Sequence, residues 1–522
     1  MKESKIDTLL KKIFIVFVLI QPFLDVYFLY TDQVVSIFKF SPSTLIRFSI
    51  IGVMFIYMLF KYRKSKKILP VIAYVGVAII YAVLHHLFVR NFTSYDPNNF
   101  GYSMAKEFFY IARLVIPVIL MFIVVDFKFT FEELRKYIGI VAFIVGTVIV
   151  FANLFKIGLG SYTNEVIKDN IFGWFTGAYK QYSFYELASK GWFNFANQIS
   201  GLLILLALIT FYSLSKRMSV YNVYNVIVIM LSMLMLGTKV ALYGMFLAIG
   251  SIVVIYIISY LKDRKVQNLN KYSVILMLVL VASYIGLIQF SPSQNRAEIN
   301  TYIAENREKK TKDDDEIDMD VLNQKLVQVK DSSYEEKIAF IEENYEYYSI
   351  NQEFIEDGYS YKIDPDFWLE EFQKPLEDRL NYRKLEEVMI KRVVSINGKS
   401  SSKWFGISYI RVQNIFNIER DFILQYYTIG IIGLIIFIII PFVIPVFVMG
   451  LYILKRFKNL MTEQNMLLIV SILLILAIAY FSGNIIDSLI ITIYLSFIIG
   501  VLFNNIFEKE EVKLLDEEKI DN

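Results

Sequence analysis

The stretch WFGISYIRVQNIFNIERDFILQYYTIGIIG, from Trp404 to Gly433, decides how the chain can be arranged. A long polar segment ends here and an apolar helix begins, with Arg411, Glu419, Arg420 and Asp421 beside it. Ionisable groups at membrane depth are costly unless they are paired or face water. We therefore interpret this stretch as a candidate site at the edge of a membrane.

The composition of the whole chain supports a membrane setting. Of its 522 residues, 56% are apolar and only 20% are charged, which predicts an all-α polytopic membrane protein. The net charge of +3 does not suggest a nucleic-acid partner. No cysteine occurs, which excludes disulfides, thiolate catalysis and Cys-ligated metals. The two histidines, His85 and His86, are expected at a membrane interface in preference to a metal site.

Apolar runs long enough to span a bilayer recur along the chain, and we predict twelve of them. Their approximate cores are 13–30, 43–60, 68–88, 108–125, 137–155, 196–214, 220–236, 239–258, 272–290, 422–448, 465–482 and 485–503. The basic segments are the amino terminus, 61–67, 216–217, 262–271 and 455–458. All of them fall on one side of a twelve-span topology, so both termini are predicted to be cytoplasmic.

The segment from Ser291 to Asp421 is then a large extracellular insertion. It holds 19 Lys and Arg against 28 Asp and Glu, a net charge of −9. The predicted organisation is a membrane region of nine helices (1–290), the acidic insertion (291–421), three further helices (422–507) and a cytoplasmic tail (508–522). Within the insertion, Asp366 to Val394 shows helical spacing, with Pro375 expected to kink it. The charge run from Thr311 to Asp320 is interpreted as a solvated face in preference to a calcium loop.

Several charged residues stand at the outer ends of the predicted spans. Arg47 can meet Asp25 across a hairpin, and we favour an ion pair there over a substrate role. Arg113 lies more than a turn inside its apolar run. Lys239, in LMLGTKVALYG, begins the eighth span, where its ammonium and the helix dipole would both attract an anion. A lysine that only snorkels to the interface is the alternative.

Convergence of the predicted spans would give an outward-facing cationic cluster of Arg113, Lys239, Arg411 and Arg420. Such a cluster suits a pyrophosphate, whose charge must be held in the ground state and stabilised further as it leaves. The carboxylates Glu419 and Asp421 could accept a proton from an attacking hydroxyl. They could equally neutralise the neighbouring arginines.

The order of these motifs resembles the O-antigen ligase and polymerase superfamily of bacterial membrane glycosyltransferases, in its Gram-positive branch. The matching segments are QPFLD (Gln21 to Asp25), SPSTLIRF (Ser41 to Phe48), EFFYIARLVIPVI (Glu107 to Ile119), LGTK (Leu236 to Lys239), WFGISY (Trp404 to Tyr409), ERDFILQYYTIGIIG (Glu419 to Gly433) and SGN (Ser482 to Asn484). They cover most of the predicted membrane portion but not the insertion.

The resemblance implies a membrane glycosyltransferase, with a fold like that of other multi-span glycosyltransferases, acting at the outer face of the cytoplasmic membrane. It would transfer an undecaprenyl-pyrophosphate-linked glycan to an acceptor hydroxyl, with no nucleotide sugar, metal or other cofactor. Rim cations would bind the pyrophosphate: Lys239, Arg411, Arg420, Arg113 and Arg47. Lys239 stands where many members have an arginine. Related ligases carry a histidine near the start of the late span, which is absent here, so Asp421 or Glu419 would replace it.

We expect a polymerase or ligase of a surface polysaccharide, such as a capsule or wall polymer. Expected partners are the lipid-linked glycan, membrane lipid, a flippase and a chain-length regulator. The alternative from another class is a polysaccharide or lipid-linked-oligosaccharide transporter, although no matched pair of interrupted helices is visible. A membrane-anchored extracellular sensor is the third hypothesis.

Overall fold

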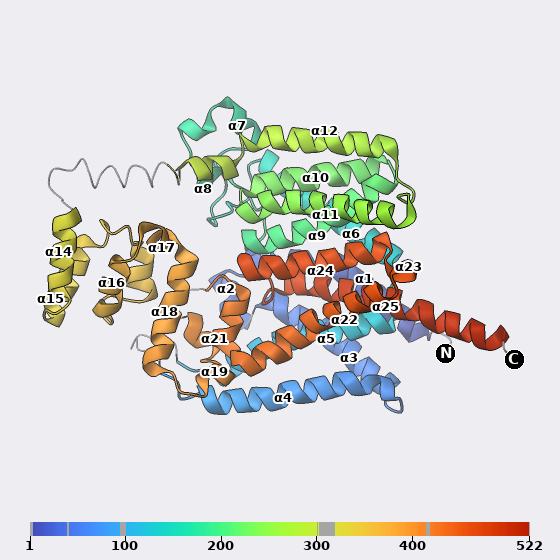
Figure 1. The fold of residues 1–522 in the computed structure, drawn as a ribbon, viewed down its shortest axis with the longest axis horizontal. Helices are drawn as coiled ribbons and strands as arrows, with labels where there is room; N and C mark the ends of the chain where they lie inside the picture. Colours follow the sequence, from blue (N-terminus) through green and yellow to red (C-terminus); the bar gives the residue numbers. More distant parts are fainter. Residues whose placement is uncertain are drawn as a thin grey trace. The chain divides into compact units, whose positions relative to one another are not determined.

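The computed structural model describes residues 4–38, 41–93, 101–299, 301, 319–413 and 418–520 (Figure 1). The chain is 78% helical, and no strand forms within those ranges. Only three isolated bridges occur there, such as that between Leu159 and Val166. The protein is an all-α polytopic membrane protein, as its composition predicts.

Ten helices within the described residues are long and apolar enough to cross a membrane. In chain order they are α3 (Pro42–Lys61), α4 (Leu69–Val89), α5 (Met104–Asp126), α6 (Phe131–Leu154), α9 (Ala196–Lys216), α11 (Lys239–Asp263), α12 (Lys271–Ile288), the run α21 (Asp421–Leu434), η6 (Ile435–Val443) and α22 (Ile444–Lys455), α24 (Glu463–Phe481), and α25 (Leu489–Ile520). Each coincides with a predicted apolar run.

The other two predicted spans are shorter helices. These are α1 (Lys5–Ile20) and α10 (Val220–Leu236), of 16 and 17 residues. The prediction of a span from 13 to 30 is wrong in its end, since α1 stops at Ile20 and continues as η1 (Gln21–Asp25) and η2 (Tyr27–Leu29). Pro22 has no N–H to continue the helical ladder. The hydroxyl of Tyr494 donates instead to the carbonyl of Val18, at 2.7 Å.

Shorter helices connect these elements. They are α2 (Asp32–Phe38), α7 (Ile171–Thr176), α8 (Phe184–Leu187), α14 (Met319–Val329), α15 (Tyr334–Asn344), α16 (Pro365–Phe372), α17 (Leu376–Leu380), α18 (Tyr382–Asn397), α19 (Ser402–Phe405), α20 (Tyr409–Gln413) and α23 (Phe457–Leu460). The chain forms two compact units. Unit 1 comprises 1–75, 113–297 and 440–522, and unit 2 comprises 76–112 and 298–439.

Helix α9 is the centre of unit 1. It is apolar on all sides and almost entirely buried, as expected of a helix surrounded by other helices. Helices α6, α10, α11, α12, α24 and α25 pack around it. Close approach depends on small residues, because a Cβ on Gly244 of α11 would lie 2.2 Å from Ile204 of α9.

The basic segments meet at one end of unit 1, which we call the basic end. Lys61, at the end of α3, bridges two carboxylates: Asp7 of α1 at 2.8 Å and Asp126 of α5 at 2.9 Å. The amide of Asn504, on α25, donates to the carbonyl of Phe129, at 3.2 Å, just before α6. Helix ends from five separate segments are therefore joined here.

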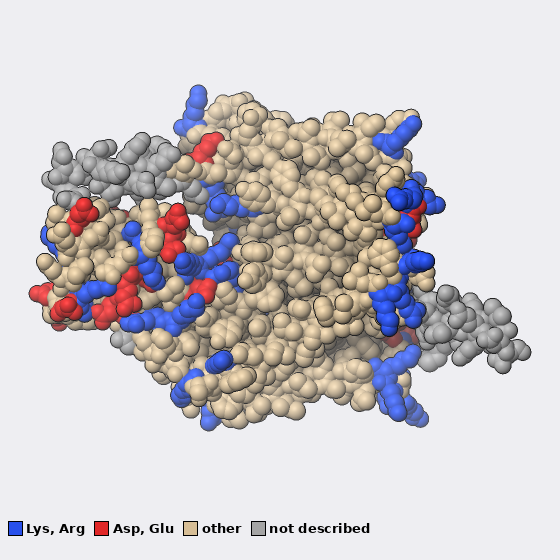
Figure 2. Space-filling view, in the orientation of Figure 1, with Lys and Arg blue, Asp and Glu red and all other residues tan. Residues whose placement is uncertain are grey.

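The same end receives α9, α11, α12 and α24. Lys216 pairs with Glu463, which also accepts a hydrogen bond from Ser259 at 2.9 Å. The ammonium of Lys262 donates to the carbonyl of Met461 at 3.0 Å. Figure 2 shows Lys and Arg side chains along this edge of unit 1. The loops that the topology places on one side therefore do meet.

Unit 2 contains the insertion helices α14 to α18. Their core surrounds Trp368, which is fully buried and donates from its indole N–H to the carbonyl of Tyr359 at 2.8 Å. The single kinked helix predicted for 366–394 is wrong, because Pro375 separates α16 from α17 and Asn381 separates α17 from α18. Most of the predicted charge run, residues 311–318, lies outside the described residues. Acidic side chains are numerous on the insertion's surface (Figure 2).

Candidate functional site

The stretch from Trp404 to Gly433 folds back on itself through two glycines. Gly406 has φ +77° and Gly430 has φ +65°, backbone conformations that other residues rarely adopt. A Cβ on Gly406 would lie 2.1 Å from the carbonyl oxygen of Thr428, and one on Gly430 would lie 2.4 Å from Trp404. The N–H of Ile407 donates to the carbonyl of Tyr427, at 2.9 Å. We call this close backbone pairing the glycine interlock.

A buried polar network attaches the loop of this interlock to α4 and α5. Nε2 of His85, on α4, lies 2.9 Å from Oε1 of Glu107, on α5, and both side chains are at most 1% exposed. Nδ1 of His85 lies 2.6 Å from the carbonyl of Phe405. Glu107 accepts from the Ser408 hydroxyl at 2.8 Å and from the Tyr409 N–H at 3.1 Å. The network therefore fixes both ends of loop 405–409.

Arg411 lies two residues further on, in the short helix α20. Its side chain is 6% exposed, and burial lowers the pKa of its guanidinium while the nearby charge of Glu107 opposes that shift. The ring of Tyr409 stacks on Tyr110 with a centroid distance of 4.0 Å. The amide of Gln425, on α21, donates to the Tyr110 hydroxyl at 2.6 Å. Arg411 is thus a buried cation supported by α5 and α21.

Glu419 and Arg420 pair with charged residues of α18 instead of with each other. Arg383 Nε donates to Glu419 at 2.8 Å, and Arg420 pairs with Glu387. The N–H of Glu419 donates to Glu386 at 3.1 Å. Burial raises the pKa of Glu386 to about 8. These contacts attach α18 to the segment that precedes α21.

Asp421 is fully buried at the first position of α21. A carboxylate in the first turn is favoured by the helix dipole. This placement favours a structural role for Asp421, and the ion pair with Glu387 favours one for Arg420.

Lys239 stands at the first position of the 25-residue helix α11. Thr238 caps the helix by accepting from the N–H of Ala241 at 3.1 Å, and the Lys239 side chain is exposed. Among the residues that the structure describes, no ion pair or hydrogen bond holds its ammonium. The turn before it is built closely, because Gly237 has φ +63° and packs against Ala188 and Pro292.

The two other rim arginines of unit 1 have protein partners. Arg47 is 1% exposed and forms the predicted ion pair with Asp25, while Gln21 accepts further bonds from it at 2.9 Å. Arg113 donates to the carbonyl of Asp487, in the turn before α25. A further cation of unit 1 is Arg296, which donates to the Tyr162 hydroxyl at 2.7 Å.

Tyr162 in turn donates to the carbonyl of Gly237 at 2.8 Å, so Arg296 is linked by two hydrogen bonds to the turn that precedes Lys239. The guanidinium also lies over the ring of Tyr162, at 4.8 Å. Sequence reasoning did not select Arg296, His85, Glu107 or Asp487. The available signal for Glu107 was its position directly before the predicted apolar run 108–125.

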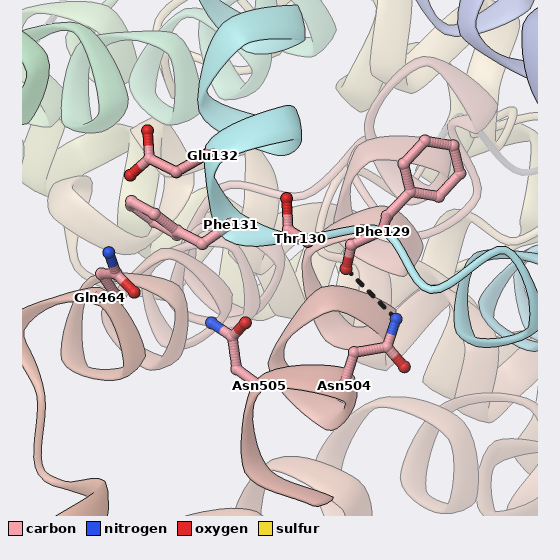
Figure 3. Close-up of a pocket in the computed structure, with 7 residues that line it drawn as sticks. All are labelled: Phe129, Thr130, Phe131, Glu132, Gln464, Asn504 and Asn505. Atoms are coloured by element: carbon pink, nitrogen blue, oxygen red, sulfur yellow. Dashed lines mark hydrogen bonds between the residues drawn. The ribbon is translucent and has the colours of Figure 1, made fainter. Parts of the chain in front are cut away.

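A pocket of about 230 Å³ lies at the basic end of unit 1 (Figure 3). Its lining residues are Phe129, Thr130, Phe131, Glu132, Gln464, Asn504 and Asn505. None of the predicted site residues is among them.

Comparison with known families completes these observations. A family model described as O-antigen ligase like membrane protein matches residues 7–509. The chain belongs to this family. The match includes both units, the glycine interlock and every predicted site residue, and it confirms the family that the motif order indicates. No curated protein matches the chain.

Membership in the O-antigen ligase-like family establishes the general activity. The protein is a multi-pass membrane enzyme of glycosyl transfer that acts in polysaccharide assembly. Two features of this chain bear on the proposal for glycosyl transfer below: the network of His85 and Glu107 with loop 405–409, and the exposed Lys239.

Proposed function

We propose that the protein polymerises or ligates undecaprenyl-pyrophosphate-linked oligosaccharides at the outer face of the cytoplasmic membrane. Its product would be a surface polysaccharide, and both termini would lie in the cytoplasm. Polymerisation of repeat units is the form of the reaction that we favour. Family membership supports glycosyl transfer, and the remaining argument concerns how a lipid pyrophosphate would be held.

The observation that carries the proposal is the exposure of the Lys239 side chain at the start of α11. Its ammonium is exposed at the amino-terminal end of α11, where the helix dipole also attracts an anion. Arg47 and Arg420 have their charge compensated by Asp25 and Glu387. Lys239 is therefore the predicted rim cation best suited to receive an external phosphate.

In unit 2, the cation that we propose for phosphate binding is Arg411. A guanidinium that is largely removed from water interacts strongly with an anion, and its planar donors match two phosphate oxygens. The negative charge of Glu107 lies near Arg411 and partly offsets its positive charge. Glu107 is not itself proposed to contact the substrate. In unit 1 the proposed phosphate-binding residue is thus Lys239, with Arg113 as the next candidate. Arg411 is proposed for unit 2 from its own surroundings.

The reaction would proceed by displacement. The acceptor hydroxyl oxygen forms a bond to the anomeric carbon, and the bond from that carbon to the pyrophosphate oxygen breaks. The electron pair leaves with undecaprenyl pyrophosphate, whose added charge the cations stabilise. The hydroxyl proton passes to a carboxylate. We assign this step to Glu419, whose side chain is 35% exposed, in preference to the fully buried Asp421.

Substitution of Lys239 tests the proposal in cells. Lys239→Ala should abolish surface polymer and leave single repeat units on the lipid carrier, whereas Lys239→Arg should retain polymer because it keeps the cation. Lys271→Ala is the matched control, since Lys271 is also an exposed first residue of a helix but lies at the basic end. Polymer length is read on gels and protein amount by immunoblot of membranes. Normal polymer from Lys239→Ala would refute the assignment.

A further inference from the structure

The buried pair of His85 and Glu107 has no role in the proposed chemistry, yet it contacts loop 405–409 at three points. We propose that His85 and Glu107 are positioning residues that fix Arg411 for pyrophosphate binding. This inference rests on the proposed function. It concerns residues of unit 2 only.

The hydrogen-bond partners determine where protons lie in the pair. The carbonyl of Phe405 can only accept, so Nδ1 of His85 carries a proton. One further proton must lie between Nε2 and Oε1 of Glu107, because these atoms are 2.9 Å apart and would otherwise present two lone pairs to each other. His85 thus holds a carbonyl with one nitrogen and a carboxylate with the other.

Glu107 is well placed to be the negative partner. It accepts hydrogen bonds from His85, the Ser408 hydroxyl and the Tyr409 N–H, and it lies in the first turn of α5. Each of its two carboxylate oxygens thus faces a hydrogen-bond donor. An imidazolium and carboxylate pair therefore satisfies every partner at this site.

The effect reaches Arg411 through the start of α20. Tyr409 is the first residue of α20 and Arg411 is its third. Glu107 holds the N–H of Tyr409, and the ring of Tyr409 stacks on Tyr110. Loss of the carboxylate or of its imidazole partner would release the start of α20, so that Arg411 would no longer be held in one orientation.

Two substitutions of His85 separate the effect of its hydrogen bond to Glu107 from the effect of its side-chain volume. His85→Gln retains an amide donor that can reach Glu107, whereas His85→Leu has similar bulk and no donor. Loss of a charge-assisted hydrogen bond corresponds to roughly a 10- to 100-fold change in a binding constant. We expect His85→Leu to weaken binding by about tenfold or more, and His85→Gln to restore most of that loss.

Binding is measured on the full-length protein in lipid nanodiscs, with undecaprenyl pyrophosphate as the probe. Arg411→Ala should weaken binding, and the double variant His85→Leu with Arg411→Ala should bind no more weakly than Arg411→Ala alone. Such non-additivity is expected if His85 acts through Arg411. Additive losses, or wild-type affinity in His85→Leu, would overturn the inference while leaving the proposed function intact.

A second readout needs no substrate. The chain has no cysteine, so Lys403→Cys on exposed α19 gives a single attachment point for a spin label. His85→Leu should increase the label's mobility in the electron paramagnetic resonance spectrum, and unchanged mobility would contradict the positioning role. Failure of the wild-type protein to bind the probe would overturn the proposed function, and the inference with it.

Discussion

Substitution of Gly406 by alanine should disrupt the glycine interlock. The new Cβ would lie 2.1 Å from the carbonyl oxygen of Thr428 and 2.7 Å from the backbone nitrogen of Ile429. Both neighbours are backbone atoms, so no flexible side chain can move aside. The φ of +77° adds a cost of about 1–3 kcal/mol for a residue with a Cβ, and overpacking adds about 1–3 kcal/mol.

The expected destabilisation is therefore about 2–6 kcal/mol, a large fraction of the stability of a typical fold. Thermal unfolding in detergent, followed by tryptophan fluorescence, measures it, because Trp404 lies two residues away. Gly450→Ala is the control: a Cβ there meets nothing within 4 Å in α22, and alanine should stabilise that helix by up to about 1 kcal/mol. Equal unfolding temperatures for Gly406→Ala and the wild type would refute the reasoning.

Three further predictions concern charged groups. Burial raises the pKa of Glu386 to about 8, above its value of 4.5 in the unfolded chain, so the folded insertion binds a proton that the unfolded chain has lost. The stability of the insertion should therefore fall as the pH rises from 4.5 to about 8, and Glu386→Gln should flatten this dependence in thermal unfolding. Asp364→Ala removes the cap of α16 and the partner of Arg392, at 2.7 Å, and should cost about 2–4 kcal/mol in denaturant unfolding, with Asp364→Asn less harmful. Lys61→Met leaves two largely buried carboxylates without their cation and should lower the unfolding temperature more than Lys271→Met, an exposed control.

The apolar runs were predictable because the thickness of the bilayer sets the number of apolar residues in a spanning helix, and this number can be counted in the sequence. The end of α1 was not predictable from the local sequence. Pro22 leaves the carbonyl of Val18 without its helical partner, and the hydroxyl that satisfies this carbonyl belongs to Tyr494, more than 400 residues away. The turn before Lys239 was recognisable from its glycine and capping threonine.

The site showed the same division. The charges from Arg411 to Asp421 were visible in the sequence, but their partners were not. Arg420 pairs with Glu387, which lies within the acidic segment that the resemblance did not cover. Similarly, the sequence placed His85 only at a membrane interface, and its pairing with Glu107 depends on the packing of α4 against α5. Long-range pairing of side chains requires the packing of helices that local pattern does not specify.

The central claim is that a glycosidic bond is formed at the expense of a lipid pyrophosphate. It is tested most directly with purified full-length protein in proteoliposomes supplied with lipid-linked repeat units, with products followed by mass spectrometry. The account predicts one undecaprenyl pyrophosphate released for each new bond, and loss of both products in Lys239→Ala. Movement of intact lipid-linked glycan across the bilayer, with neither bond formation nor release, would contradict it and identify a transporter.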